Sequence, residues 1–278
     1  TSIKELAHRI SIISAERVRD EFTKILMSSN PRKGITLLVD TGLADLVLPE
    51  IPKLRLEVDE HHHHKDVYEH SITVLEQAIA HEERLAGPNL VIRLAALLHD
   101  IGKPKTRAFI EGGGVSFHHH EVVGARLAKK RLQALRFDNH TIDAVELLTT
   151  LHLRFHGYGE GEWTDSAVRR YVRDAGEFIT HLHVLTRADC TTRNTAKAAR
   201  LAATYDSLEA RIAVLMEQEE LSKIRPDLDG EQVMQILNMK PSREVGQAMD
   251  FLLELRLEQG PIGAEAATKA LLEWWAKR

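Results

Sequence analysis

Apolar positions recur at helical spacing along almost the whole chain. They repeat every three or four residues over Ser2–Ile13 and again after Ser14, a residue type that favours helix N-caps. Glycine and proline separate the later helical segments, as at Gly42 and at Gly260–Pro261. Only residues 107–117, which contain three consecutive glycines, indicate a turn or a short hairpin. The sequence therefore predicts an all-α fold.

Changes in composition divide the chain into three predicted helical domains. A small subdomain covers residues 1–56 and is followed by the polar stretch His61–His64, which we interpret as solvated loop histidines. The central domain covers residues 57–225 and ends at a Pro- and Gly-containing linker. A helical tail is predicted for residues 226–278.

The most apolar segment of the central domain ends in an adjacent histidine and aspartate, His99 and Asp100. A buried helix that ends on an imidazole and a carboxylate is costly unless a partner satisfies both groups. A metal ion is the simplest such partner, and His70 and Asp189 lie on other predicted helices. Two imidazoles and two carboxylates suit Mn, Fe, Co, Ni, Zn or Mg and leave coordination positions open.

A metal site of this kind predicts hydrolysis of a phosphate ester. The metal activates water beside a phosphorus atom, and Lys103 is placed to meet a phosphate oxygen electrostatically. Asp100 and Lys103 are therefore the predicted catalytic residues. Three further histidines would hold a second metal or a phosphate: His120, His152 and His156. A lone interior histidine is more often a hydrogen-bonded core residue, so both interpretations stay open for these three.

Composition excludes several classes of protein. The 278 residues are 43% hydrophobic and 28% charged, which is typical of a soluble globular protein, and no apolar run is long enough to cross a bilayer. The single cysteine, Cys190, excludes an internal disulfide framework, so we expect a reducing, cytoplasmic location. The first residue is Thr1 rather than Met, which suggests a fragment of a longer protein or a processed chain.

The net charge of −4 gives no global case for nucleic-acid binding. Basic residues nevertheless cluster locally, and the candidates for contact with RNA are Lys129, Lys130, Arg131, Arg169 and Arg170. The default interpretation of any one cluster is a solvated helix face.

The constellation resembles the HD superfamily of metal-dependent phosphohydrolases. The matching segments are Asp66–Ser71, Leu97–Pro104, Phe117–Ala125 and Leu185–Asp189. The resemblance implies that one divalent metal is held by four ligands: His70, His99, Asp100 and Asp189. It also implies that His120 and His152 correspond to positions used by family members that hold a second metal.

The flanking segments resemble class II tRNA nucleotidyltransferases and the related bacterial poly(A) polymerases. Ser14–Leu26 and Gly42–Glu50 look like the neck that follows the catalytic head of these enzymes, and Leu228–Met234 and Pro241–Gly246 look like their last helical part. The central part is similar to the actinobacterial type of CCA-adding enzyme with an HD domain. The Gly-Ser turn and Asp-x-Asp pair of the head have no suitable counterpart here, so the chain resembles neck, HD body and tail without the head.

The resemblance implies a phosphohydrolase acting on phosphomonoesters or 2′,3′-cyclic phosphodiesters of RNA ends or nucleotides, in the tRNA-binding part of such an enzyme. Its partners would be tRNA or RNA 3′ ends and nucleotide phosphates, with no membrane. The alternative is a tRNA-binding scaffold whose HD site is vestigial or structural. A free-standing HD nucleotidase is a third interpretation, and the neck-like segment argues against it.

Overall fold

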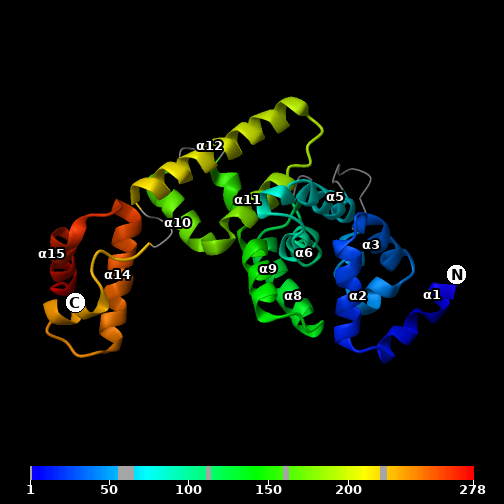
Figure 1. Ribbon diagram of the computed structural model, residues 1–278, viewed down its shortest axis with the longest axis horizontal. Helices are drawn as coiled ribbons and strands as arrows, with labels where there is room; N and C mark the ends of the chain where they lie inside the picture. The colour runs from blue at the N-terminus through cyan, green and yellow to red at the C-terminus, as the bar shows by residue number, and fades with distance from the viewer. Residues whose placement is uncertain (1, 56–65, 111–113, 159–162, 220–223) are drawn as a thin grey trace. The chain divides into compact units, whose positions relative to one another are not determined.

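The structure is a computed structural model that describes residues 2–55, 66–110, 114–158, 163–219 and 224–278. Within these ranges nearly all regular structure is helical, as Figure 1 shows, so the prediction of an all-α fold is confirmed. The exception is a short hairpin in which β1 (Ala108–Phe109) pairs antiparallel with β2 (Val115–Ser116). The histidines of His61–His64 lie outside the described residues.

Packing divides the chain into two compact units. One contains Thr1–His156 and Glu177–Ala202, and the other contains Gly157–Gly176 and Ala203–Arg278. Each unit therefore consists of two segments that are separated in the sequence. The predicted domain limits at residues 56 and 225 stay predictions, because this division by compactness does not test them.

The first unit begins with short helices: α1 (Ser2–Leu6), η1 (Ala7–Ile12), α2 (Ala15–Met27), α3 (Pro31–Asp40), α4 (Leu43–Val47) and η2 (Pro52–Leu54). Ser14 caps α2 as predicted, since its side chain accepts from the Arg17 amide. Helix α3 begins at Pro31, because Asn30 caps it and Pro31 fits the first helical turn.

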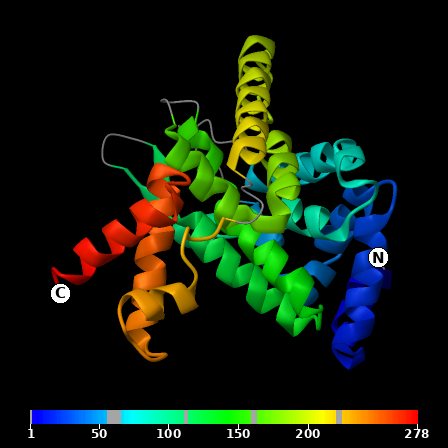
Figure 2. The same cartoon turned by 60° about the vertical axis from the view of Figure 1, so that its left-hand side comes forward.

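The rest of the first unit surrounds the most apolar helix. Its elements are α5 (Val67–Ala80), η3 (Glu82–Leu85), α6 (Leu90–Leu98), α7 (Lys103–Thr106), α8 (His120–Ala134), α9 (Asn139–Leu151) and α11 (Ile179–Ala188). Helix α6 is buried from Ile92 to Leu98 and contacts α2, α5, α9 and α11. Helices α8 and α9 lie side by side in Figures 1 and 2. The core is therefore built around the helix that ends at His99.

A buried ion pair joins the N-terminal helices to this core. The guanidinium of Arg93 on α6 contacts both carboxylate oxygens of Glu82 at 2.7 Å. Its remaining nitrogen donates to the carbonyl oxygens of Leu26 and Ser28 at the end of α2, at 2.9 and 3.0 Å. Arg93 thus satisfies carbonyls that the end of a helix leaves without partners.

The second unit holds α10 (Asp165–Ala175), most of α12 (Thr195–Glu219), α13 (Gly230–Ile236), α14 (Arg243–Gln259) and α15 (Gly263–Trp275). The short helices η4 (Arg154–Tyr158) and η5 (Gly176–Phe178) lie at the boundaries between the units. The core of the last three helices contains Leu228, Val233, Ala248, Leu252, Ala267 and Leu271.

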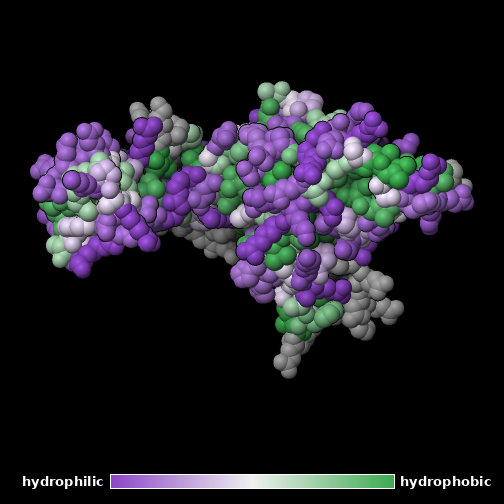
Figure 3. Space-filling view, turned by 90° about the horizontal axis from the view of Figure 1, so that it is seen from below, coloured by the Kyte–Doolittle hydropathy of each residue, from purple (hydrophilic) through white to green (hydrophobic). Residues whose placement is uncertain are grey.

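The N-terminal helices leave large apolar side chains exposed: Ile3, Leu6, Ile12, Ile13, Leu37 and Leu46. Figure 3 shows hydrophobic surface over these helices. No helix within the described residues is both long enough and apolar enough to cross a bilayer.

Candidate metal centre

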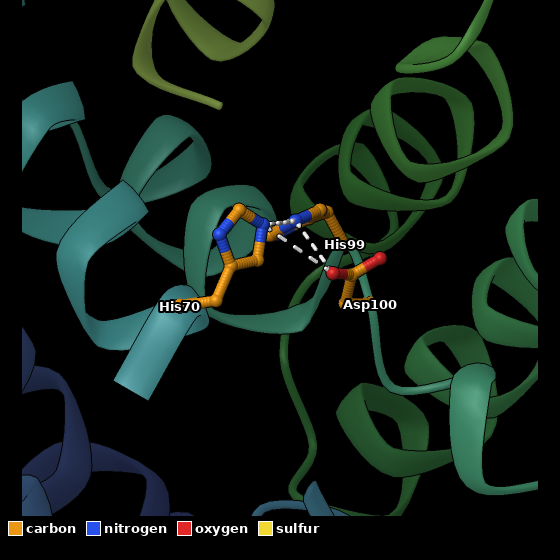
Figure 4. Close-up of side chains that lie close together, drawn as sticks. All are labelled: His70, His99 and Asp100. Atoms are coloured by element: carbon orange, nitrogen blue, oxygen red, sulfur yellow. Dashed lines mark hydrogen bonds and ion pairs between the residues drawn. The ribbon is translucent and has the colours of Figure 1, made fainter. Parts of the chain in front are cut away.

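Two helix ends and one helical turn bring the four predicted ligands together. His99 is the C-cap of α6, Asp100 follows it, Asp189 is the C-cap of α11, and His70 lies in α5. Nε2 of His70 lies 2.9 Å from Oδ1 of Asp189 and 3.5 Å from Oδ2 of Asp100. Nε2 of His99 lies 3.2 Å from the same Asp100 oxygen and 3.4 Å from Nε2 of His70. Figure 4 shows these imidazoles and the Asp100 carboxylate converging on one point.

The other oxygen of Asp100 faces a second group of histidines. His120 opens α8 and places Nε2 3.2 Å from Oδ1 of Asp100, and Nε2 of His152 at the C-cap of α9 lies 4.0 Å from it. The ligand atoms of His70, His99 and Asp100 lie within 4.8 Å of one another, and so do those of Asp100, His120 and His152. Asp100 is therefore shared by two triads. The side chain of His156 lies outside the described residues.

Backbone carbonyls orient three of the imidazoles. Nδ1 of His99 donates to the carbonyl of Ala96 at 2.9 Å, and Nδ1 of His120 donates to that of Phe117 at 2.8 Å. Nδ1 of His152 donates to the carbonyl of Thr149 at 2.6 Å. Each bond places the proton on Nδ1 and leaves Nε2 as the atom that faces the cluster, which is the arrangement of metal-ligating histidines.

The sequence did not indicate what supports the fourth imidazole. Nδ1 of His70 lies 3.2 Å from Oγ1 of Thr191, two residues after Asp189. The position of Thr191 near a predicted ligand was the one signal in the sequence. Threonine is so common in loops that this spacing alone could not predict its contact with His70.

Two buried nitrogen atoms are left without hydrogen-bond partners. They are Nε2 of His120 and Nε2 of His152. A buried polar atom without a partner is rare and calls for an explanation such as a bound ion. The donor set of imidazole nitrogens and carboxylate oxygens fits a divalent transition metal or magnesium, so the residues present fit the implied cofactor.

Electrostatics keep the two carboxylates charged. Burial acts to raise the pKa of Asp100, but His99 and Lys103 hold that pKa well below its usual range. Burial opposes ionisation of Asp189 too, but its hydrogen bond to His70 and the charge of His99 lower its pKa. Both side chains are therefore anionic at neutral pH and attract a cation.

The histidines behave in two different ways. Burial and the neighbouring His99 lower the pKa of His152 to about 4, so its imidazole is neutral and able to bind metal at pH 7. Burial also acts to lower the pKa of His99, but Asp100 and Asp189 raise it above its ordinary value. A metal ion would compete with the proton on His99 for the same carboxylates.

A close approach between two glycines sets the spacing of the triads. A Cβ atom on Gly102 would lie 2.1 Å from the carbonyl oxygen of His120 and 2.7 Å from the amide nitrogen of Gly124. The turn after Asp100 can touch the start of α8 only because position 102 has no side chain. This contact holds Asp100 against His120.

The predicted RNA-contacting residues differ in their surroundings. Lys129 contacts Glu146 at 2.6 Å and Arg131 contacts Glu50 at 2.8 Å, while Arg169 and Arg170 also bind carboxylates. Lys130 is exposed and has no ion-pair partner among the described residues. Their role in binding RNA stays a prediction.

Comparison with known proteins gives two family matches. Residues 1–54 match the family described as the probable RNA and SrmB-binding site of polymerase A, and residues 67–216 match the HD domain. These matches confirm the family resemblance predicted from the sequence.

Similar proteins cover nearly the whole chain. The A-adding tRNA nucleotidyltransferase of Deinococcus radiodurans is 32% identical over 274 residues, which are 98% of this chain and 61% of that protein. The CC-adding tRNA nucleotidyltransferase of Thermus thermophilus is 34% identical over 278 residues, 97% of this chain and 58% of that protein. The multifunctional CCA protein of Neisseria meningitidis serogroup A is 36% identical over 149 residues, 52% of this chain and 34% of that protein.

This chain thus spans about three-fifths of the length of the first two relatives. The HD-domain match covers more than half of it and contains every predicted metal ligand. With the RNA-binding segment of the polymerase A type ahead of that domain, the chain belongs to the HD-domain family.

Proposed function

We propose that this chain is a metal-dependent phosphohydrolase that acts on phosphomonoesters or 2′,3′-cyclic phosphodiesters of RNA ends or nucleotides. The observation that supports this most is the shared Asp100, whose two oxygens face two separate groups of imidazoles. A structural histidine cluster has no need of two buried nitrogen atoms that lack partners.

Each residue has a proposed role. His70, His99, Asp100 and Asp189 would hold one divalent ion, and His120 and His152 would hold a second ion with Asp100, or a phosphate. Bound divalent metal, whether Mn, Mg, Ni, Co, Fe or Zn, supplies Lewis-acid activation of water and of the phosphate. Lys103, whose Nζ lies 2.6 Å from Asp100, would move to neutralise a phosphate oxygen.

The RNA context comes from the relatives and the N-terminal match. Two proteins similar along nearly the full chain are named as tRNA nucleotidyltransferases, and residues 1–54 match an RNA-binding segment. We therefore propose tRNA or RNA 3′ ends as partners and a cytoplasmic location, with this chain forming the tRNA-binding part of a nucleotidyltransferase. In this proposal the residues of the metal centre take no part in nucleotide addition.

Metal analysis combined with turnover tests the hydrolase. The chain is expected to bind divalent metal and to hydrolyse bis-p-nitrophenyl phosphate and 2′,3′-cyclic AMP, with loss of both properties in His99→Ala and Asp100→Ala. His118→Ala is the matched control, because His118 is exposed. Absence of metal-dependent turnover, with both site variants unchanged in every assay, would reject the proposal.

A second candidate is a tRNA-binding scaffold with a structural HD site. The contact between Lys103 and Asp100 favours it, because an ammonium already neutralises the shared carboxylate. In this case tRNA binding depends steeply on salt, remains after treatment with EDTA, and is accompanied by no hydrolysis. Hydrolysis that requires metal would exclude this candidate.

A further inference from the structure

A polar cleft of about 690 Å³ opens beside the metal centre. Helix α5 supplies Glu69, His70 and Thr73 to its lining, and the loop after α11 supplies Thr191, Thr192 and Arg193. His70 thus belongs both to the cleft and to the first ligand triad. A molecule in the cleft would lie against a metal ligand.

The metal centre is accessible from this side. The side chains of His70 and Asp189 are 14% and 15% exposed, whereas that of His99 is fully buried and that of Asp100 is 2% exposed. Solvent therefore reaches His70, which lines the cleft, and Asp189, but hardly reaches His99 and Asp100. A substrate approaching the first triad must enter next to His70.

The loop that carries Arg193 is held in place. The Gln77 amide donates to the carbonyl oxygens of Ala188 and Cys190, at 2.7 and 3.3 Å, in the orientation that satisfies both of its ends. The amide of Asn194 donates to Oγ1 of Thr192 at 3.3 Å, and Oδ1 of Asn194 accepts from the Lys197 amide at 2.9 Å. Arg193 therefore has a fixed backbone although its side chain is exposed.

The charge of Arg193 is uncompensated. Its guanidinium has no hydrogen-bond or ion-pair partner among the described residues, whereas Arg32 contacts both Glu69 and Glu76 at 2.8 Å. Arg193 is the one arginine or lysine in the described lining of the cleft, and Asp66 and Glu69 are its carboxylates. The cleft thus offers one anchor for an anion, and the described lining provides no second cation for a further negative charge.

We propose that this cleft binds the substrate of the metal centre, and that Arg193 holds an oxygen of a single phosphate group and selects against ligands with a second phosphate. An arginine fork matches the geometry of a phosphate, whereas Asp66 and Glu69, the latter paired with Arg32, offer no partner to an added phosphate. The Thr73 hydroxyl donates to the Glu69 carbonyl at 2.8 Å and keeps its lone pairs for a donor group of the ligand. This inference rests on the proposed phosphohydrolase function and adds a specificity-determining residue to it.

Calorimetric titration of the full chain loaded with Mn²⁺ tests the anchor. Adenosine 2′-monophosphate is expected to bind about tenfold more weakly to Arg193→Gln than to the unmodified chain, the loss of roughly one charge-assisted hydrogen bond. Arg193→Lys should recover part of this affinity. Lys197→Gln removes the same charge from the exposed first turn of α12, outside the cleft, and should bind normally.

Selectivity is measured with a matched ligand. Adenosine 2′,5′-bisphosphate carries the same 2′-phosphate plus a second phosphate, and we expect it to bind no more tightly than the monophosphate. Glu69→Gln should shift the ratio toward the bisphosphate. In turnover of 2′,3′-cyclic AMP, Arg193→Gln should raise KM with kcat within twofold and with unchanged metal content.

The outcomes separate this inference from the proposed function. Binding that depends on Arg193 without any hydrolysis supports the anchor and rejects the hydrolase. Hydrolysis with equal affinity and KM in Arg193→Gln and Lys197→Gln overturns the anchor and keeps the hydrolase. Absence of adenosine 2′-monophosphate binding, or tighter binding of the bisphosphate, also overturns the inference.

Discussion

Nζ of Lys103 lies 2.6 Å from Oδ2 of Asp100, the carboxylate that both ligand triads share. The ammonium and a metal ion therefore compete for one buried oxygen. We predict that Lys103→Met lowers the unfolding free energy of the metal-free chain by about 1–3 kcal/mol, because it leaves a buried carboxylate with less compensation. Mn²⁺ should reverse most of that loss, and hydrolysis should fall.

Urea unfolding in EDTA and in Mn²⁺ measures this effect. Lys105→Met is the matched control, since Lys105 is an exposed residue of the same short helix α7. An equal loss of stability with and without metal would show that Lys103 and the metal do not share Asp100.

The close approach at Gly102 gives a second prediction. Its backbone has φ −75° and ψ −25°, which alanine adopts freely, so Gly102→Ala acts only through its contacts with the His120 carbonyl and the Gly124 amide. We expect destabilisation by about 1–3 kcal/mol and a reduced metal content, because α8 must move away from Asp100.

Gly246→Ala provides the control for this substitution. Gly246 lies within α14, and a Cβ atom there would contact nothing within 4 Å. Alanine should stabilise this helix by about 0.5–1 kcal/mol. Full metal content and unchanged stability in Gly102→Ala would show that α8 tolerates the shift.

The sequence predicted the first ligand group because its evidence is local. An apolar helix that ends on His99 and Asp100 raises the same energetic question in any fold, and the resemblance to the HD superfamily implied His70 and Asp189. The role of Gly102 could not be predicted this way. In the sequence Gly102 simply follows the apolar helix, whereas the structure shows that it touches α8, which begins at His120.

Long-range partners explain the other differences. His120 and His152 were left between two interpretations because only the packing of α8 and α9 against the end of α6 places their Nε2 atoms near Asp100. The basic run at Arg169 gave no hint of Glu219, which lies on another helix and binds its guanidinium at 2.8 Å. Charge is visible in a sequence, but the partner that neutralises it is not.

The lowered pKa of His152 predicts a specific pH dependence. Burial and His99 bring this pKa to about 4 from an ordinary value of 6.5, so the folded chain binds this proton less readily than the unfolded chain. The contribution to stability is complete above about pH 6.5 and is lost as the pH falls toward 4. The difference between the two pKa values corresponds to about 3 kcal/mol.

The free energy of unfolding of the chain in EDTA, measured between pH 7 and pH 4, gives this pH-dependent contribution of His152. His152→Gln keeps a side-chain amide that can donate to the Thr149 carbonyl but does not titrate, so its stability should decline less over this range. The comparison at each pH cancels groups common to both chains. Parallel curves for the two chains would contradict the assignment.

The five basic residues predicted to contact RNA should divide into two classes. The Arg169 guanidinium is buried, pairs with Glu219, and donates to the carbonyls of Leu257 and Glu258 at 3.1 and 3.3 Å. Arg169→Gln should therefore lower the unfolding free energy by about 3–5 kcal/mol, because it leaves a buried carboxylate unpaired. Under conditions in which Arg169→Gln stays folded, the affinity of this variant for tRNA should depend on salt as that of the unmodified chain does.

Lys130→Gln should show the opposite behaviour, because the exposed ammonium has no carboxylate partner among the described residues. If it contacts a phosphate, its loss weakens tRNA binding without sequence preference and reduces the slope of log affinity against log salt by about 1. Filter binding over a range of KCl concentrations, with urea unfolding of the same samples, measures both quantities. An altered salt slope in Arg169→Gln at unchanged stability would mean that Arg169 leaves Glu219 to contact the RNA. In that case the ion pairs of the free chain would not identify which basic residues bind RNA.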